Sequence, residues 1–359
     1  MTPDDAAAPP TTERTDLVPL LPEEIGALFA SWGEQPYRGL QVFSWIHARR
    51  VASFDEMTNL SKSLRARLAE SCTVSRLDPV SILDSKDGTR KLLFDAPDGG
   101  RYNAVLMPSE DRVTLCISSQ IGCRMGCRFC LTASLKFRRS LTAAEIVGQV
   151  LAASRLLPEG SRVTNVVFMG MGEPLDNFDE VVRAVRVMTH REGLRVAPRK
   201  TTVSTVGLLP QMRAFLEANT GASLALSLCA TEDEIRSQVA PAVKKYPLDD
   251  TVQALRSMPL AHGHTYTIEY QLIPGVGASL ADAKRLSRLL AHFPAKVNLI
   301  PFNPWPGAPY RSPTADEVEM FRRVLSEKNH RVTVRWSRGA DIGAACGQLD
   351  GRGSEEGES

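Results

Sequence analysis

The feature that most constrains the fold is the regular alternation of strand-like and helix-like segments after residue 112. Each strand-like run is short and rich in β-branched residues, and a longer stretch with apolar residues three or four positions apart follows it. The expected strands cover residues 113–118, 163–170, 200–205, 222–228, 265–273 and 296–302. The expected helices cover residues 142–157, 179–190, 210–218, 250–258, 280–293 and 314–329, and a last strand follows at 331–336.

Six such units predict an α/β fold, with a parallel sheet and helices packed outside it. Because a standard closed barrel of this kind has eight units, six units predict an open, partial (β/α)6 barrel. In parallel α/β folds the functional groups gather at the carboxyl ends of the strands. We therefore expect a site among the segments that follow the strands.

The segments before residue 112 have a different character. The first residues are rich in Pro, Thr, Ala and Asp, and helical periodicity follows them. Turn signals at Asp87-Gly88 and Asp98-Gly99 then indicate hairpins. The expected parts of the chain are a disordered tail (1–19), a helical accessory domain (20–72), a β-hairpin connector (73–110), the barrel core (111–349) and a second disordered tail (350–359).

Four of the seven cysteines lie within residues 115–134, in and after the first expected strand. Cys123, Cys127 and Cys130 form a C-x3-C-x2-C triplet, and Cys116 lies seven residues upstream. Three thiolates on a short loop can hold three irons of a cubic [4Fe–4S] cluster and leave the fourth iron open. A structural zinc site is the alternative, but it needs four ligands and usually takes them as two separated pairs. The spacing favours the cluster and leaves zinc as the alternative.

Further candidate residues follow the other expected strands. Glycine lets the backbone approach a ligand closely, and a carboxylate beside it can meet an ammonium group. The candidates are Gly172 and Glu173 after the second strand, Ser204 in the third, Ser227, Leu228 and Cys229 at the fourth, and Asn303 after the sixth. Each of these residues, taken alone, is also compatible with a structural role in a turn or a rigid loop. Their common edge of the sheet favours one shared site.

Composition and the amino terminus limit the class of protein. Hydrophobic residues make up 43% of the 359 residues and charged residues 23%, as in an ordinary globular protein. No apolar run approaches the ~18 residues that span a membrane, and the amino terminus lacks the basic and apolar regions of a signal peptide. We therefore expect a cytoplasmic protein whose reduced cysteines serve metal binding or catalysis. Cys72, which has no polar cluster around it, is expected to be a simple buried thiol.

Two stretches of the chain are locally basic although the net charge is only +2. Residues 110–139 contain six cations against two acids, and residues 183–200 contain six cations against one. Such stretches suit a phosphate backbone, but they also occur on ordinary solvated faces. The charge pattern alone leaves both interpretations open.

Four sequence stretches together resemble a known family. They are LCISSQIGCRMGCRFC, NVVFMGMGEPL, IPFNPWPGAPY and DIGAACGQL. The cysteine triplet resembles that of the radical S-adenosylmethionine enzymes, and the whole set resembles the dual-specificity RNA adenine-C2 methyltransferases, which modify 23S rRNA and tRNA. FASWGEQPYRGLQVFSWIH and FDEMTNLSKSLRARL are similar to the accessory, RNA-binding domain of that family. The likeness extends over residues 20–350.

The resemblance implies a set of cofactors and site residues. Cys123, Cys127 and Cys130 would hold one [4Fe–4S] cluster per chain, whose open iron would bind S-adenosylmethionine. The residues that would contact S-adenosylmethionine are Gly172, Glu173, Ser204, Ser227, Leu228, Cys229 and Asn303. The implied partners are 23S rRNA, tRNA and an electron donor such as flavodoxin or ferredoxin, and the implied state is a monomer.

The resemblance also implies roles for two further cysteines. Each turnover would use two molecules of S-adenosylmethionine, of which the first methylates Cys346. The second would be cleaved to a 5′-deoxyadenosyl radical that takes a hydrogen from this methyl group, and the resulting methylene radical would add to C2 of adenine. Cys116 would then take the C2 proton and form a transient disulfide with Cys346.

Two positions depart from the family pattern. Asn103 stands thirteen residues before Cys116, where the family usually has a glutamate that is proposed as a proton acceptor. An asparagine cannot act as a carboxylate base. Cys229 replaces the family histidine in the Ser-Leu-His stretch, which puts a side-chain role at that position in doubt. A related C8-methylating resistance enzyme and a non-enzymatic zinc and RNA-binding module are the alternative functions.

Overall fold

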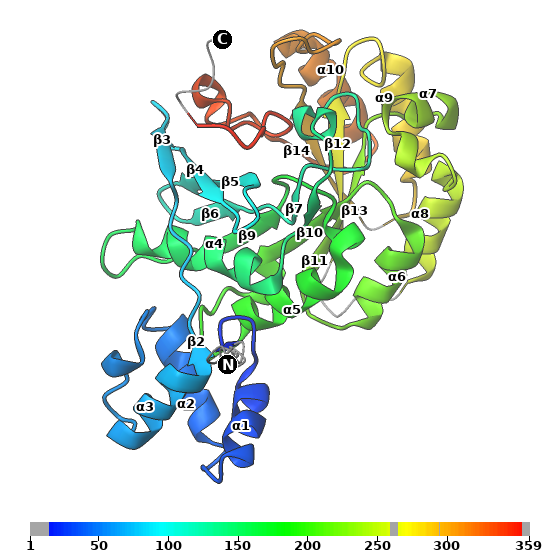
Figure 1. Cartoon of the computed structure of the whole chain (residues 1–359). Coiled ribbons are helices and arrows are strands. Elements are labelled where there is room, and N and C mark those ends of the chain that lie inside the picture. Colours follow the sequence, from blue (N-terminus) through cyan, green and yellow to red (C-terminus); the bar gives the residue numbers. More distant parts are fainter. Residues whose placement is uncertain (1–13, 259–264, 294, 354–359) are drawn as a thin grey trace, which may run out of the picture.

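A single curved sheet forms the centre of the molecule (Figure 1). The computed structural model describes residues 14–353, apart from 259–264 and 294. Within these residues, ten strands are paired in the order β14-β13-β12-β11-β10-β9-β6-β5-β4-β3. The mutually parallel strands are β6 (Val113–Cys116), β9 (Asn165–Phe168), β10 (Thr201–Thr205), β11 (Ser223–Leu228), β12 (Tyr266–Leu272), β13 (Ala295–Pro301) and β14 (Arg331–Val334).

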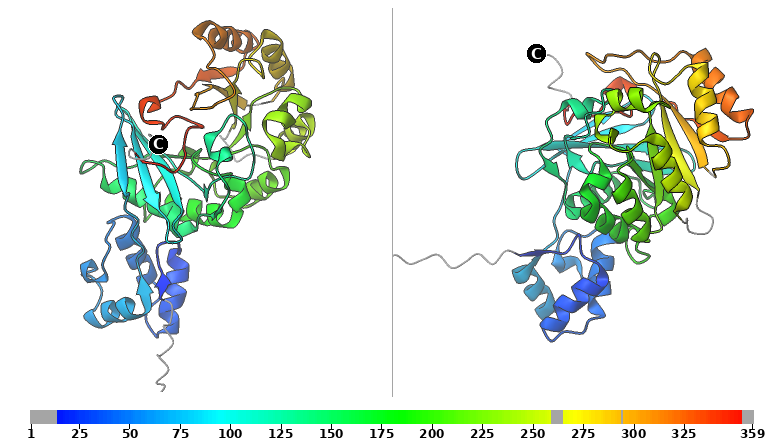
Figure 2. Two further views of the ribbon diagram at one scale, coloured as in Figure 1. Left: turned by 45° about the horizontal axis from the view of Figure 1, so that its top comes forward. Right: turned by 90° about the vertical axis from the view of Figure 1, so that its right-hand side faces the viewer.

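Helices connect these strands and cover the outer face of the sheet (Figures 1 and 2). They are α4 (Ala143–Arg155), α5 (Phe178–Thr189), α6 (Leu209–Glu217), α7 (Asp233–Val239), α8 (Leu248–Ser257), α9 (Leu280–Leu289) and α10 (Ala315–Ser326). Capping boxes at Thr142 and Thr314 fix the starts of α4 and α10, because each threonine accepts a hydrogen bond from the backbone three residues on. This arrangement confirms the predicted partial barrel. The short helix α7 was not predicted.

The hairpin region extends the barrel sheet. Its strands β3 (Ser81–Asp84), β4 (Arg90–Asp95) and β5 (Arg101–Pro108) are antiparallel to one another. β5 also pairs antiparallel with β6, so that Val105 lies opposite Cys116. The segment that the sequence presents as a connector therefore forms the continuation of one wall of the barrel.

Three helices, α1 (Pro22–Ser31), α2 (Arg38–His47) and α3 (Lys62–Ser71), form a separate lobe below the barrel in Figure 1. A two-stranded parallel sheet of β1 (Thr15–Asp16) and β2 (Cys72–Thr73) joins the ends of this lobe. Leu17 and Val18 are fully buried, so the ordered chain begins before residue 19, and residues 1–13 of the predicted tail lie outside the described residues. Cys72 is buried, as predicted, and burial raises its pKa to about 11.

A short segment after the last strand crosses the open side of the barrel, from β14 toward the hairpins (Figure 2, left). Its end is held by two contacts: Lys91 pairs with Asp350 at 3.2 Å, and the backbone N–H of Gly351 donates to Oδ1 of the buried Asn103 at 2.8 Å. The predicted tail from residue 350 is therefore packed as far as residue 353, and residues 354–359 lie outside the described residues. The polar sequence of this segment resembles a solvated tail, because the residues that hold it, Lys91 and Asn103, lie about 250 positions earlier in the chain.

Across the part of the chain described here, no helix combines the length and the apolar character needed to cross a bilayer.

Truncation after Leu349 should destabilise the protein. The truncation removes Asp350, the carboxylate partner of the buried Lys91, and Gly351, whose N–H donates to Oδ1 of Asn103. We expect the loss of both contacts to lower the free energy of unfolding by about 2–4 kcal/mol. Truncation after Gly353 keeps both contacts and is the matched control. Urea unfolding followed by circular dichroism measures the difference. Equal stability of the two truncated proteins would contradict the importance of these contacts.

Candidate active site

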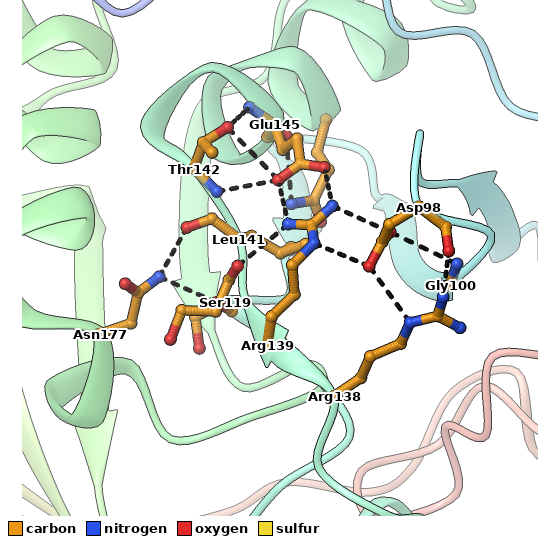
Figure 3. Close-up of polar contacts among 11 residues, drawn as sticks. Asp98, Gly100, Ser119, Arg138, Arg139, Leu141, Thr142, Glu145 and Asn177 are labelled. Atoms are coloured by element: carbon orange, nitrogen blue, oxygen red, sulfur yellow. Dashed lines mark hydrogen bonds and ion pairs between the residues drawn. The ribbon is translucent and has the colours of Figure 1, made fainter.

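The cysteine loop begins and ends on a small antiparallel ladder. β7 (Gln120–Ile121) pairs with β8 (Arg139–Ser140), which closes the loop that carries the cysteine triplet. The side-chain amide of Asn177 donates to the backbone oxygens of Ser119 at 3.0 Å and Leu141 at 2.8 Å, one on each arm of the loop (Figure 3). Asn177, which follows β9, therefore fixes both arms of the cysteine loop.

An ion-pair network fixes the carboxyl end of the same loop (Figure 3). Arg139 pairs with Glu145 at 2.7 Å, in the first turn of α4, and with Asp98 at 3.1 Å, in the β4–β5 turn. Arg138 also pairs with Asp98 at 3.1 Å. On the other arm, Arg124 pairs with Asp176 at 3.0 Å. Much of the first basic stretch is thus used to hold the cysteine loop.

All three cysteines of the triplet line one cavity at the carboxyl ends of the strands, which we call the upper cavity. Cys127 is buried, whereas Cys123 and Cys130 are partly exposed. Burial raises the pKa of Cys123 to about 12 and that of Cys127 well above its usual value. Among the described residues, no three Cys, His, Asp or Glu side chains converge on a single ion position. A cubic cluster does not require such convergence, because each thiolate binds a different iron.

Residues from three other strand ends complete the upper cavity. Gly172, Glu173, Ser204, Ser227 and Leu228 all line it, as the sequence predicts. Their convergence follows from the parallel order of β9, β10 and β11. The hydroxyls of the two serines lie 2.8 Å apart on neighbouring strands.

Gly172 cannot be replaced without displacing the loop. Its φ is 96°, and an added Cβ would lie 2.4 Å from the Cβ of Gln120. The next residue, Glu173, is buried and accepts backbone hydrogen bonds from Val206 at 3.0 Å and Leu175 at 3.1 Å. Desolvation raises the pKa of Glu173 to about 7, although these hydrogen bonds oppose the shift. A cationic group bound in the cavity would lower this pKa and favour the carboxylate.

Cys346 reaches the upper cavity from the far end of the sequence. The amide of Asn303 donates to the backbone oxygen of Cys346 at 3.0 Å, and Leu131 N–H donates to Gly347 O at 2.8 Å. These bonds tie the crossing segment to the cysteine loop and to the loop after β13.

A second cavity lies on the other side of Cys346, and we call it the lower cavity. Cys116 and Cys346 both line it, and Cys346 is the only cysteine among the described residues that lines both cavities. Cys346 is accessible to solvent, whereas Cys116 is buried. Cys346 therefore lies between the cavity of the cysteine triplet and the cavity of Cys116.

The thiols of Cys116 and Cys346 both resist ionisation. The surrounding protein raises the pKa of Cys116 to about 12 and that of Cys346 to about 12. Ionisation of Cys116, Cys130 or Glu269 raises the pKa of Cys346 further, while the Arg335 guanidinium lowers the pKa of both thiols. Both cysteines are free, and at neutral pH both are protonated, a state that disfavours thiol–disulfide exchange.

Comparison with known proteins decides the family. Residues 15–74 match the family model of the ribosomal RNA large subunit methyltransferase N-terminal domain, and residues 117–281 match the radical SAM superfamily. The dual-specificity RNA methyltransferase RlmN of Geobacter sulfurreducens is 48% identical over 94% of this chain and 92% of its own length. That of Geotalea uraniireducens is 47% identical over 95% and 98%. The chain belongs to this family.

A solved structure supports the same conclusion. The crystal structure of a radical SAM methyltransferase from Sphaerobacter thermophilus aligns with a TM-score of 0.88 and 40% identity, covering 94% of this chain and all of that one. Members of the radical SAM superfamily use a [4Fe–4S] cluster and S-adenosylmethionine, and these are the cofactors of this enzyme. The three thiols that share the upper cavity fit such a cluster.

Two of the predicted cofactor-binding residues do not line the upper cavity. Asn303 instead holds the backbone of Cys346, and its Oδ1 accepts a hydrogen bond from Ser337. The thiol of Cys229 is buried, and burial raises its pKa to about 12. Asn103, at the position of the family glutamate, lines neither cavity and binds Gly351.

Sequence reasoning missed one acidic residue of the site. Glu269 lies inside β12, lines the upper cavity and is only 3% exposed. Its Oε1 accepts a hydrogen bond from Asn298 at 2.8 Å and lies 4.0 Å from Arg335, while its Oε2 has no partner among the described residues. Burial raises the pKa of Glu269. A charged residue in the middle of an expected buried strand was the signal that could have identified it.

The Glu269→Gln variant should make the Cys346 thiol easier to ionise. Removing a neighbouring negative charge lowers a thiol pKa, so the pH profile of alkylation moves to lower pH. Iodoacetamide labelling of cluster-free protein between pH 7 and 10, with peptide mass spectrometry of Cys346, measures the shift. Glu319→Gln, on the outer face of α10, is the control. An unchanged profile in Glu269→Gln would show that the carboxylate does not act on this thiol.

Proposed function

We propose that this protein is a radical S-adenosylmethionine methyltransferase that methylates C2 of adenine in 23S rRNA and tRNA. The observation that carries the proposal is the position of Cys346 between the cavity of the cysteine triplet and the cavity of Cys116. A methyl carrier has to meet a methyl donor on one side and an RNA base on the other. The names of the relatives favour this function over C8 methylation.

The chain's own residues divide the binding of the cofactors. Cys123, Cys127 and Cys130 hold one cluster per chain, and Gly172, Glu173 and the strand-end residues Ser204, Ser227 and Leu228 bind S-adenosylmethionine. We assign Cys229 to the residues that bind S-adenosylmethionine, through its backbone. We assign Asn303 to the same residues and also to the positioning of Cys346. When bound, these groups supply one methyl cation equivalent and one reductively generated radical per turnover, which consumes two molecules of S-adenosylmethionine.

Carbon 2 of adenine requires unusual chemistry because it is electron-poor and carries no acidic proton. Carbon 2 therefore cannot act as the nucleophile of an ordinary methyl transfer. Cys346 carries the new carbon as a thioether and presents it to the base. Cys116 lines the lower cavity. In its thiolate form it takes the C2 proton after the carbon–carbon bond exists, and the unpaired electron left on the base would pass to the oxidised cluster. After losing this proton, Cys116 sulfur attacks Cys346 sulfur. The new S–S bond replaces the bond between Cys346 sulfur and the new carbon, which leaves with the electron pair and takes a proton from solvent to become the methyl group.

Arg335 is placed to help the later step. Its guanidinium favours the thiolate form of both cysteines, and it lies 4.0 Å from Glu269. Because Asn103 cannot act as a carboxylate base, Cys116 alone receives the proton, in its thiolate form.

We further place the enzyme in the cytoplasm, as a monomer that receives electrons from a flavodoxin or ferredoxin. Reduced thiols and RNA substrates are both found in that compartment. The test of the proposed function is reconstituted enzyme with a reductant, S-adenosylmethionine and 23S rRNA or tRNA, followed by nucleoside mass spectrometry against authentic 2-methyladenosine. Formation of 8-methyladenosine, or of no methylated base, would overturn it.

Replacement of Cys127 with Ala should remove the cluster. Because each thiolate holds a different iron, two cysteines cannot retain the cube, and we expect nearly complete loss of iron together with the absorbance near ~400 nm. Iron analysis after anaerobic reconstitution measures the loss. Cys72→Ala, in the helical lobe, is the control and should retain full iron. Full iron content in Cys127→Ala would contradict the assignment of the triplet.

Replacements of Cys346 and Cys116 should fail at different stages. Cys346→Ala cannot accept the methyl group and should give neither product nor adduct. Cys116→Ala should form the carbon–carbon bond but not release it, so protein joined covalently to RNA accumulates. Denaturing gel electrophoresis with thiol reductant detects this band, and nuclease treatment should remove it. Normal turnover of Cys116→Ala without any adduct would show that Cys116 has no part in the reaction.

A further inference from the structure

We propose that the substrate RNA enters through the lower cavity, at the amino-terminal mouth of the barrel, and that Arg112, Arg199, Lys200 and Lys296 bind its phosphates there. This inference rests on the proposed function, and it adds the route and the contacts of the substrate.

The lower cavity opens at the ends of the strands opposite to the cysteine triplet. Residues that begin four parallel strands line it: Thr114, Asn165, Thr202 and Lys296. The crossing segment after β14 forms another wall, and the cavity of about 500 Å³ extends inward to Cys116 and Cys346. A base that enters at this mouth therefore arrives at the two thiols without passing the cysteine triplet.

The two cavities have opposite charge. The described residues that line the upper cavity include Glu173 and Glu269 and no Lys or Arg. The described residues that line the lower cavity include no acid, and its cations are Arg112, Arg199, Lys200, Lys296, Arg335 and Arg338. A polyanion that entered through the upper cavity would place phosphates against buried carboxylates, whereas the lower mouth attracts them.

Four of the six cations are free to bind phosphate. Arg335 lies near Glu269, and Arg338 donates to the backbone oxygens of Pro108 and Asp87. In the described structure the other four side chains form no ion pair or hydrogen bond, and all four are exposed. They come from three separate places in the sequence: the residue before β6, the residues before β10 and the start of β13.

The two basic stretches of the sequence, residues 110–139 and 183–200, contain cations that hold the fold together and cations that remain unpaired. Arg183 is used to hold the helical lobe, because it pairs with Glu24 at 2.8 Å. Arg124 and Arg139 hold the cysteine loop. From the same two stretches, Arg112, Arg199 and Lys200 remain unpaired in the described structure and meet at one mouth. The fold thus places these free positive charges at the cavity that Cys116 and Cys346 line.

An exposed aromatic residue stands beside these cations. Trp336 lines the lower cavity, and 62% of its surface is exposed. An exposed indole next to unpaired cations is suited to stacking against an unpaired base. The target adenine, or its neighbour in the strand, is the base that this geometry favours.

The decisive experiment measures RNA binding by cluster-free enzyme, so that catalysis is not required. The probe is a fluorescent stem-loop RNA that contains the target adenine, and the readout is anisotropy over a range of salt. Arg199→Ala/Lys200→Ala should weaken binding at least about fivefold near ~0.15 M salt, and should reduce the slope of log affinity against log salt by about 1.5. Arg213→Ala/Lys284→Ala removes two exposed cations from the outer helices α6 and α9 and should change affinity less than about twofold.

Photo-cross-linking maps the route directly. RNA with 4-thiouridine next to the target adenine should cross-link to peptides that contain residues 199–202 or Trp336. Cross-links confined to the cysteine loop or to the residues after β9, β10 and β11, or equal binding by the double variant and its control, would overturn the lower-cavity route. If the wild-type enzyme methylates no RNA, the proposed function itself fails, and cross-linking then shows separately whether RNA binds at this mouth.

Discussion

The hydrogen bonds between the cysteine loop and the crossing segment are the interactions on which the site depends. Leu131 N–H donates to Gly347 O at 2.8 Å, and the hydroxyl of Thr132 donates to Leu349 O at 2.6 Å. Without these bonds Cys346 would belong to a polar carboxyl-terminal extension and not to the barrel. These bonds join the crossing segment to the cysteine loop and so keep Cys346 at the boundary of the upper and lower cavities.

Desolvation and charge then give each cavity its chemistry. The thiols of the triplet, of Cys116 and of Cys346 all have raised pKa values because the barrel interior disfavours their charged forms. Binding of iron reverses this penalty for the triplet. For Cys116 and Cys346, the protonated state disfavours thiol–disulfide exchange, and the Arg335 guanidinium opposes part of the rise in their pKa values. Under the proposed function, the acidic residues of the upper cavity and the cations of the lower cavity would separate a cationic cofactor from a polyanionic substrate.

Several parts of the fold were predictable because their signals are local. The alternation of strands and helices follows from hydrophobic periodicity, and the convergence of Gly172, Ser204 and Ser227 follows from the parallel order of the strands. Helix α7 escaped prediction because seven residues give too little periodicity. The pairing of β5 with β6 also escaped it, since the sequence gives hairpins but not the sheet that they join.

The sequence by itself determined the barrel and the cysteine triplet, and its resemblance to the family predicted a transient pairing of Cys346 with Cys116, which stays a prediction. It could not decide which of its many cations are free, because that depends on partners such as Asp98 and Glu24, which lie tens or hundreds of residues away. It also could not place Glu269 in the upper cavity or Asn303 on the backbone of Cys346. Only the tertiary structure decided these contacts, because they join residues that are far apart in the sequence and come together only when the chain folds around the cavities.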